Sequence, residues 1–173
     1  MKKAGLYSKF PDYASLISDF KKYIGSATGG KVVRSLSYIF SQNTNFNKVP
    51  YVFFLLMMLM LKCISHRLSK VDNLSRFLRY LQPRGDELNL DFLKKSIETR
   101  DYLTKLRLAD MSAVTILSYI QSMIRFVIFL KTKIDPGKKG EELHSICQAY
   151  KKLLHTLKKR VAKAILHELA TTK

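Results

Sequence analysis

Large apolar residues recur at helical spacing in four consecutive segments between Leu68 and Ala170, and this periodicity restricts that part of the chain to helices. In the first segment, from Asp72 to Leu81, apolar residues occupy positions i, i+3, i+4 and i+7 counted from Leu74. Pro83 and Gly85 follow, and both residue types end helices. The sequence therefore predicts a helix that stops before these two residues.

The next two segments are also bounded by residues typical of helix ends. The second starts after Asn89 and ends near Ala109 and Asp110. Ser112 is the predicted N-cap of the third, which continues until Asp135-Pro136-Gly137. Because the third segment is apolar over most of its circumference, we expect it to be the central helix and to contact every other helix.

The fourth predicted helix, from Glu141 to Leu169, has one apolar and one basic side. The apolar side carries Tyr150, Leu154, Leu157, Val161 and Ile165. The basic residues are Lys152, Lys159 and Lys163 on the opposite side, Arg160 beside them, and Lys151 and Lys158 at the edges of the apolar stripe. No acidic residue interrupts these six cations, whereas solvated faces usually mix both signs. We predict that this side binds an anion; the alternative is an ordinary solvated face.

The overall charge also points to a polyanionic partner. The chain has 31 lysines and arginines against 13 aspartates and glutamates, which gives a net charge of +18 at pH 7. Like charges at this density repel one another in the folded state and attract polyanions. Nucleic acid and an anionic membrane surface are the two partner classes, and charge alone does not separate them.

The first 67 residues have weaker organisation and are predicted to form a poorly defined N-terminal extension to a bundle over 68–173. Within this extension, Lys31 to Phe40 fits a short helix or a strand equally well. The apolar run Val49 to Leu61 is shorter than the about 20 residues that a helix needs to cross a bilayer. Three interpretations of this run stay open: a buried helix, a segment foreign to the fold of the bundle, and a membrane anchor.

Three stretches of the predicted bundle resemble a known DNA-binding domain. They are Leu74-Ser75-Arg76-Phe77-Leu78-Arg79-Tyr80-Leu81, then Tyr102-Leu103-Thr104-Lys105-Leu106, and then Ser112 to Ile120 leading into Ile124-Arg125-Phe126-Val127-Ile128-Phe129-Leu130. Together they resemble the N-terminal core-binding domain of tyrosine recombinases and integrases, above all the versions in Crypton-type transposon-derived vertebrate proteins. The basic stretch from Leu153 to Lys163 is similar to the segment that leads toward the catalytic domain in those proteins.

The resemblance implies a four-helix, SAM-like orthogonal bundle that grips double-stranded DNA. If it does, the cations of the fourth helix would meet phosphates; they are Lys152, Lys158, Lys159, Arg160 and Lys163. The candidates for contact with bases or a groove are Arg125, Lys131 and Lys133, in the second half of the third helix. The family keeps its catalytic residues on a separate C-terminal domain, so no catalytic residue is carried over to this chain.

No motif of an enzyme or a metal site stands out in the sequence. Cys63 and Cys147 lie far apart without CxxC spacing, and the four histidines form no metal-spaced pair. Glycine-rich phosphate loops and the motifs of zinc proteases and serine hydrolases do not occur. We therefore expect a protein that is not an enzyme and needs no cofactor or metal.

These observations lead to one expectation and one alternative. We expect an all-α DNA-binding module located in the nucleus, with double-stranded DNA as its partner and self-association left open. The alternative is a small membrane-associated helical protein, anchored through residues 49–61 and held to anionic lipid by its basic residues.

Overall fold

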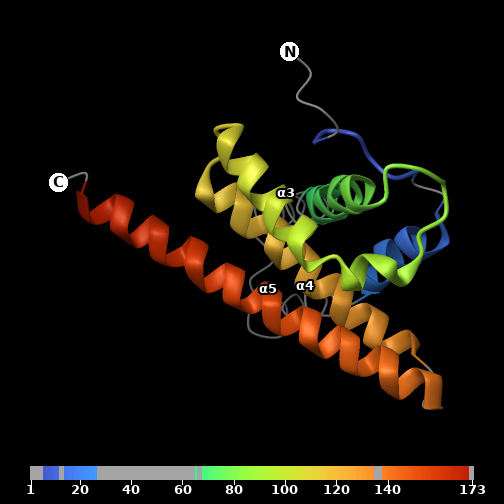
Figure 1. The fold of residues 1–173 in the computed structure, drawn as a ribbon. Coiled ribbons are helices and arrows are strands. Elements are labelled where there is room, and N and C mark those ends of the chain that lie inside the picture. Colours follow the sequence, from blue (N-terminus) through green and yellow to red (C-terminus); the bar gives the residue numbers. More distant parts are fainter. Residues whose placement is uncertain (1–5, 12–13, 27–64, 66–67, 135–137, 172–173) are drawn as a thin grey trace, which may run out of the picture.

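The computed structural model describes residues 6–11, 14–26, 65, 68–134 and 138–171, and the regular secondary structure in these ranges is helical, without a strand. Helices over residues 15–26 and 68–81 precede the short 3-10 helix η2 (Leu90–Lys94) and the helices α3 (Ser96–Leu108), α4 (Ala113–Lys133) and α5 (Lys138–Thr171). Figure 1 shows α4 and α5 side by side and antiparallel. Both η2 and α3 contact α5 as well as α4. The predicted all-α class is confirmed for the described residues.

Helix α4 is the central helix, as the sequence predicted. It begins after Ser112, whose side chain accepts a hydrogen bond from the backbone N–H of Thr115 at 3.2 Å, and so acts as the expected N-cap. Its side chains contact every other described helix. The contacts are Phe126 with Phe20 of the 15–26 helix, Phe126 with Phe92 of η2, Tyr119 with Arg76 of the 68–81 helix, Tyr119 with Tyr102 of α3, and Lys131 with Gln148 of α5.

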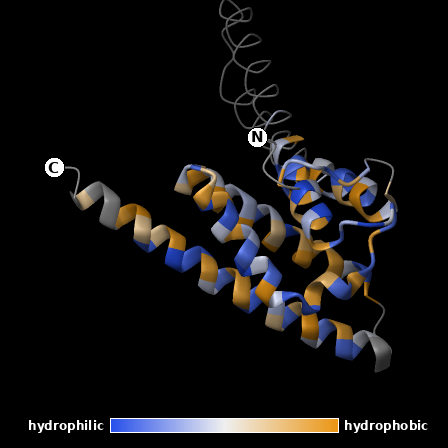
Figure 2. Ribbon diagram, turned by 45° about the horizontal axis from the view of Figure 1, so that its top comes forward, coloured by the Kyte–Doolittle hydropathy of each residue, from blue (hydrophilic) through white to orange (hydrophobic). Residues whose placement is uncertain are grey.

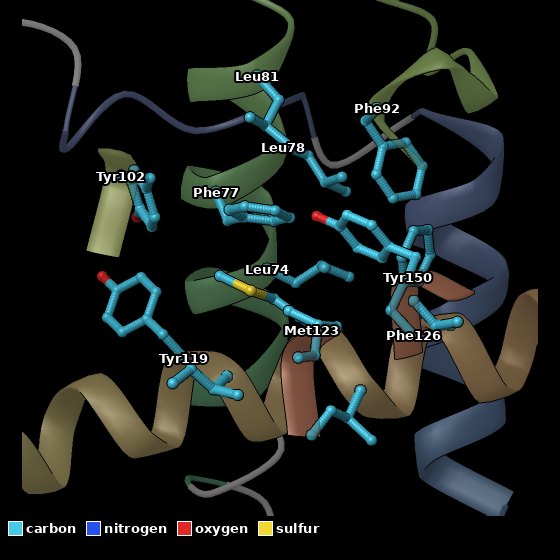
Figure 3. Close-up of a cluster of buried hydrophobic side chains, with 14 of the residues drawn as sticks. Leu74, Phe77, Leu78, Leu81, Phe92, Tyr102, Tyr119, Met123, Phe126 and Tyr150 are labelled. Atoms are coloured by element: carbon cyan, nitrogen blue, oxygen red, sulfur yellow. The ribbon is translucent and has the colours of Figure 1, made fainter. Parts of the chain in front are cut away.

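The core is one cluster of large side chains that several helices share. Figure 3 shows Phe77, Tyr102 and Tyr119 at one end of the cluster and Phe92 and Phe126 at the other. Each of these five rings is at most 1% exposed. Burial of such rings contributes most of the stabilisation in a domain of this size, because each removes a large apolar area from water.

The prediction of one continuous helix for the second segment is wrong, because the structure divides it into η2 and α3. Asn89 does start it, accepting a hydrogen bond from the backbone N–H of Asp91, but only the 3-10 helix η2 follows. At Lys95 the backbone leaves helical geometry, and the Lys95 ammonium donates to the carbonyl oxygen of Leu81 at 2.6 Å. Lys95 thereby satisfies a backbone carbonyl at the C-terminal end of the 68–81 helix, and α3 begins separately at Ser96.

Three apolar residues at helical spacing in the second and third predicted segments are exposed. They are Ile97, Val114 and Ile128, with exposed fractions of 77%, 69% and 37%. Ile97 and Val114 lie in the first turns of α3 and α4, and the periodicity of a segment does not reveal how far neighbouring helices extend over its ends.

Buried side chains of residues 6–11 and 14–26, which the sequence assigned to a poorly defined extension, belong to the packed core. Phe10 and Phe20 are buried, and the Phe10 backbone N–H donates to the carbonyl oxygen of Ser75 at 3.3 Å while the Ser75 hydroxyl donates back to the carbonyl oxygen of Phe10 at 2.9 Å. Phe20 packs edge-on against Phe126, with ring centroids 5.1 Å apart. The core of the bundle therefore begins well before residue 68.

Residues 27–64 lie outside the described residues, and with them the predicted segments 31–40 and 49–61. The proposed membrane anchor stays a prediction. Among the described helices, α4 is long and apolar enough to cross a bilayer, yet more than half of its most apolar window is buried inside the bundle. Its composition is accounted for by its central position.

Candidate nucleic-acid interface

Three lysines of α5 form the most uniform basic surface that the sequence predicted. Lys152, Lys159 and Lys163 are exposed, and helical periodicity places them within about 40° of one another around the helix axis. They follow one another over about 16 Å of helix at 1.5 Å per residue. We call these three residues the lysine face.

The helix presents this face because its opposite side is anchored. Cys147, Tyr150 and Leu154 are buried against the bundle, which fixes the rotation of α5 about its axis. Figure 2 shows hydrophobic and hydrophilic residues alternating along α5, as expected for an amphipathic helix. The predicted assignment of apolar and basic sides is confirmed for these residues.

The cations of α5 have no acidic partner within the described part of the chain. Four ion pairs occur there, and they use Asp19, Asp72, Asp86 and Asp101. Each lies on an earlier helix or in the loop after the 68–81 helix. The positive charge of the lysine face is therefore left uncompensated, which favours an external anion.

Lys158 and Arg160, the other two predicted phosphate ligands, lie to either side of the lysine face. Lys158 is half-buried at the edge of the apolar stripe, where its alkyl chain covers apolar surface. Arg160 is exposed and lines a groove together with Arg100 and Arg107 of α3. The two α3 arginines escaped the sequence analysis because their distance from Arg160 along the chain hides that they share a groove.

The three predicted groove-contacting residues of α4 are not brought together. Arg125 is exposed on α4. Lys131 donates to the side-chain oxygen of Gln148 at 3.1 Å, whereas Lys133 forms an ion pair with Asp19 at 3.5 Å. Since the last two cations have partners inside the protein, Arg125 is the better placed of the three for an external ligand.

A shallow groove connects part of α4 with the lysine face. It is lined by Lys131, Lys151, Lys152, His144 and His155, among others, and has a volume of about 1080 Å³. His144 and His155 are exposed. Glu141 also lines this groove, so the basic residues from α4 and α5 are joined there by one acidic residue.

Tyr80 does not have the environment of a nucleophile. Tyr80 donates to the carboxylate of Asp101 and accepts from the Lys105 ammonium at 2.8 Å. Partial burial raises the pKa of Tyr80, and the hydrogen bond to Asp101 raises it further. A nucleophilic tyrosine needs an easily lost proton, so this cluster acts as a link between the 68–81 helix and α3.

The described residues also contain no group of three or more histidines, cysteines or acids placed to hold a metal ion. Cys147 is buried in α5, and burial raises the pKa of its thiol. A buried thiol with a raised pKa is a poor nucleophile and a poor metal ligand.

Comparisons with families of proteins, with curated proteins and with solved structures found no match to this chain.

Proposed function

We propose that this protein is an all-α DNA-binding module, located in the nucleus, that grips double-stranded DNA through the lysine face of α5. The observation that carries the proposal is the lysine face itself: Lys152, Lys159 and Lys163 are exposed, aligned and without an acidic partner among the described residues. The likeness of the 74–130 region to the core-binding domain of tyrosine recombinases supports the same function.

The spacing of the lysine face suits a duplex. Double-stranded DNA carries one negative charge per about 1.7 Å of its axis, so the about 16 Å spanned by these lysines meets many phosphates. Contacts of this kind fix the protein on the backbone without reading bases. Binding through the lysine face is therefore expected to be weakly dependent on DNA sequence, and Arg125 is the candidate for any base contact.

The test is the salt dependence of DNA binding by the full chain. Each neutralised phosphate contributes about 0.9 to the slope of log affinity against log salt concentration. We expect a variant with Lys152→Gln, Lys159→Gln and Lys163→Gln to bind more weakly and to lose roughly 2.7 from this slope. Fluorescence anisotropy of a labelled random-sequence duplex at several chloride concentrations measures both quantities.

A variant with the same loss of charge elsewhere provides the control. Lys21, Lys22 and Lys94 are exposed and lie outside α5, and changing them to glutamine removes three charges without touching the lysine face. We expect this control to keep most of the slope of the unchanged protein. Equal losses in the two triple variants, or no binding of the unchanged protein at low salt, would refute the proposal.

A further inference from the structure

A second groove lies between α3 and the C-terminal half of α5 and has a volume of about 630 Å³. Its floor is apolar, with Leu103, Ile116 and Leu157 buried and Val161 and Ala164 half-buried. A groove of this size and character is typical of a binding site, because an apolar floor gains free energy when a ligand excludes water from it.

Three arginines stand at the rim of this groove. Arg100 and Arg107 are separated by seven residues and so lie on the same side of α3, while Arg160 comes from α5. All three are exposed, and none forms an ion pair with a described residue. Asp110 also lines the groove, so its lining carries three cations and one anion and keeps a net positive charge. Guanidinium groups bind carboxylates in bidentate fashion, which favours an acidic ligand.

One end of the groove is open because α5 extends beyond the helices beside it. The apolar stripe of α5 continues past Leu157 into Val161 and Ile165, which are only half-buried. Leu108, at the end of α3, is 75% exposed. Figure 1 shows this part of α5 extending beyond the start of α4. Apolar surface gathered at one end of a bundle is typical of an interaction site.

We propose that this groove binds an amphipathic acidic α-helix from a partner polypeptide. Leucine-type residues at i, i+3, i+4 and i+7 would lie on the floor, and acidic residues along both edges would pair with Arg100 and Arg107 on one wall and Arg160 on the other. The segment of α5 from Leu157 to Thr171 is about 21 Å long, which matches a helix of about 14 residues. Charge complementarity selects the acidic helix, since the chain as a whole carries +18.

The groove differs in chemistry from the lysine face, and for this reason DNA is not its occupant. Phosphates are strongly hydrated, and protein surfaces that bind them are polar and wet. Here the arginines surround an apolar floor that hydrated phosphates would leave uncovered. An amphipathic helix covers the floor and meets the rim at the same time.

The test uses the full chain and a labelled synthetic peptide of about 14 residues, with leucines at helical spacing and glutamates at the flanking positions. A peptide of the same composition in scrambled order has the same charge but no apolar face. We expect the periodic peptide to bind at least about tenfold more tightly than the scrambled one in fluorescence anisotropy. Equal binding would mean that only the net charge attracts the peptide, and the proposal would be overturned.

Two double variants locate the site. Arg100→Ala with Arg107→Ala removes one wall of the rim at exposed positions, so the fold is maintained, and is expected to weaken binding of the periodic peptide about tenfold or more. Lys159→Ala with Lys163→Ala removes the same charge from the lysine face and should leave peptide binding unchanged. Equal losses in both variants would overturn the proposal.

The same pair of variants separates this proposal from the proposed DNA binding. If the arginine variant reduces the salt slope for duplex DNA while the periodic peptide binds no better than the scrambled one, the groove belongs to the DNA-binding surface and the peptide proposal is overturned. If the arginine variant loses only the peptide and the lysine variant loses only DNA, both proposals are supported. Failure of one thus does not imply failure of the other.

Discussion

Asp110 ends α3 in the left-handed backbone region, with a φ of 58°. The backbone N–H of Met111 bonds the carbonyl oxygen of Leu106, and that of Asp110 bonds the carbonyl oxygen of Arg107. These two bonds form a Schellman motif, in which glycine is the usual residue at the position of Asp110. An aspartate there carries two costs, the steric penalty of the left-handed region and a negative charge at the negative end of the helix dipole.

We predict that Asp110→Gly raises the free energy of unfolding by about 1 kcal/mol, because glycine removes both costs. The greater conformational freedom of glycine in the unfolded chain offsets only part of this gain. Asp110→Ala serves as the control, since it removes the charge but keeps the steric penalty, so we expect it to gain less stability than the glycine variant. Urea unfolding followed by circular dichroism measures both changes. A glycine variant less stable than the unchanged protein would contradict the prediction.

Two buried tyrosines give the stability of the fold a pH dependence. Burial raises the pKa of Tyr102 and of Tyr150 above the ordinary value of 10.0, although the hydrogen bond between the Tyr150 and Thr99 hydroxyls lowers the pKa of Tyr150 in part. Their folded-state pKa values thus exceed the unfolded ones. The stabilisation that results is fully present below pH 10 and is lost as the pH rises above it, because only the unfolded chain then releases the protons.

We predict that Tyr102→Phe and Tyr150→Phe together flatten this alkaline loss. Each tyrosine is expected to contribute a loss of about 1.4 kcal/mol between neutral pH and pH 11, since one pKa unit corresponds to that amount. Urea unfolding of the unchanged protein and of the double variant at pH 8, 10 and 11 gives the difference between them, and other titrating groups cancel in it. A difference that stays constant over this range would show that the two hydroxyls do not act as described.

At the scale of helices, the 15–26 helix is the element whose role the sequence missed. Phe20 is fully buried and packs against Phe126 and Phe129 of α4, with ring centroids 5.1 and 5.6 Å apart. We predict that Phe20→Ala lowers the free energy of unfolding by about 3–5 kcal/mol, because the cavity and the lost ring contacts add up. Ile97→Ala is the matched control, since Ile97 is 77% exposed and should change stability little. A small effect of Phe20→Ala would mean that this helix is not part of the core.

The sequence identified α4 and α5 well because each carries its own signal. The Ser112 cap fixes the start of α4, and the opposite placement of Leu154 and Lys159 fixes the orientation of α5. The break at Lys95 depends instead on a bond from its side chain to the distant carbonyl of Leu81, and no local pattern reveals such a bond. The 15–26 helix is short, so it contains too few turns for its apolar periodicity to stand out in the sequence.

The two candidate sites also differ in whether the sequence alone could reveal them. The lysine face could be predicted because its three members follow one another on a single helix. The arginine-rimmed groove could not, because Arg100 and Arg160 lie on helices separated by the whole of α4 and meet only through the packing of the bundle. Sequence periodicity reveals the faces of helices, whereas sites between helices need the fold.

At the scale of the whole molecule, the charge of +18 makes stability and DNA binding respond to salt in opposite directions. The four described ion pairs are solvent-exposed on at least one side and contribute little to stability, so repulsion among unpaired cations is the larger long-range effect. Salt screens this repulsion, with a Debye length of about 10 Å at 0.1 M and about 3 Å at 1 M. The same salt competes with the lysine face for phosphates.

We therefore predict that raising sodium chloride from 0.05 to 0.5 M increases the free energy of unfolding, by an amount on the order of 1 kcal/mol, while it weakens DNA binding. Three phosphate contacts alone correspond to a loss of affinity of roughly 500-fold over this range. Urea unfolding and duplex anisotropy in the same buffers measure the two quantities. If the free energy of unfolding falls as salt rises, the loss of DNA affinity is explained by unfolding of the protein. If the free energy of unfolding rises while DNA affinity falls, the loss of affinity is assigned to the lysine face.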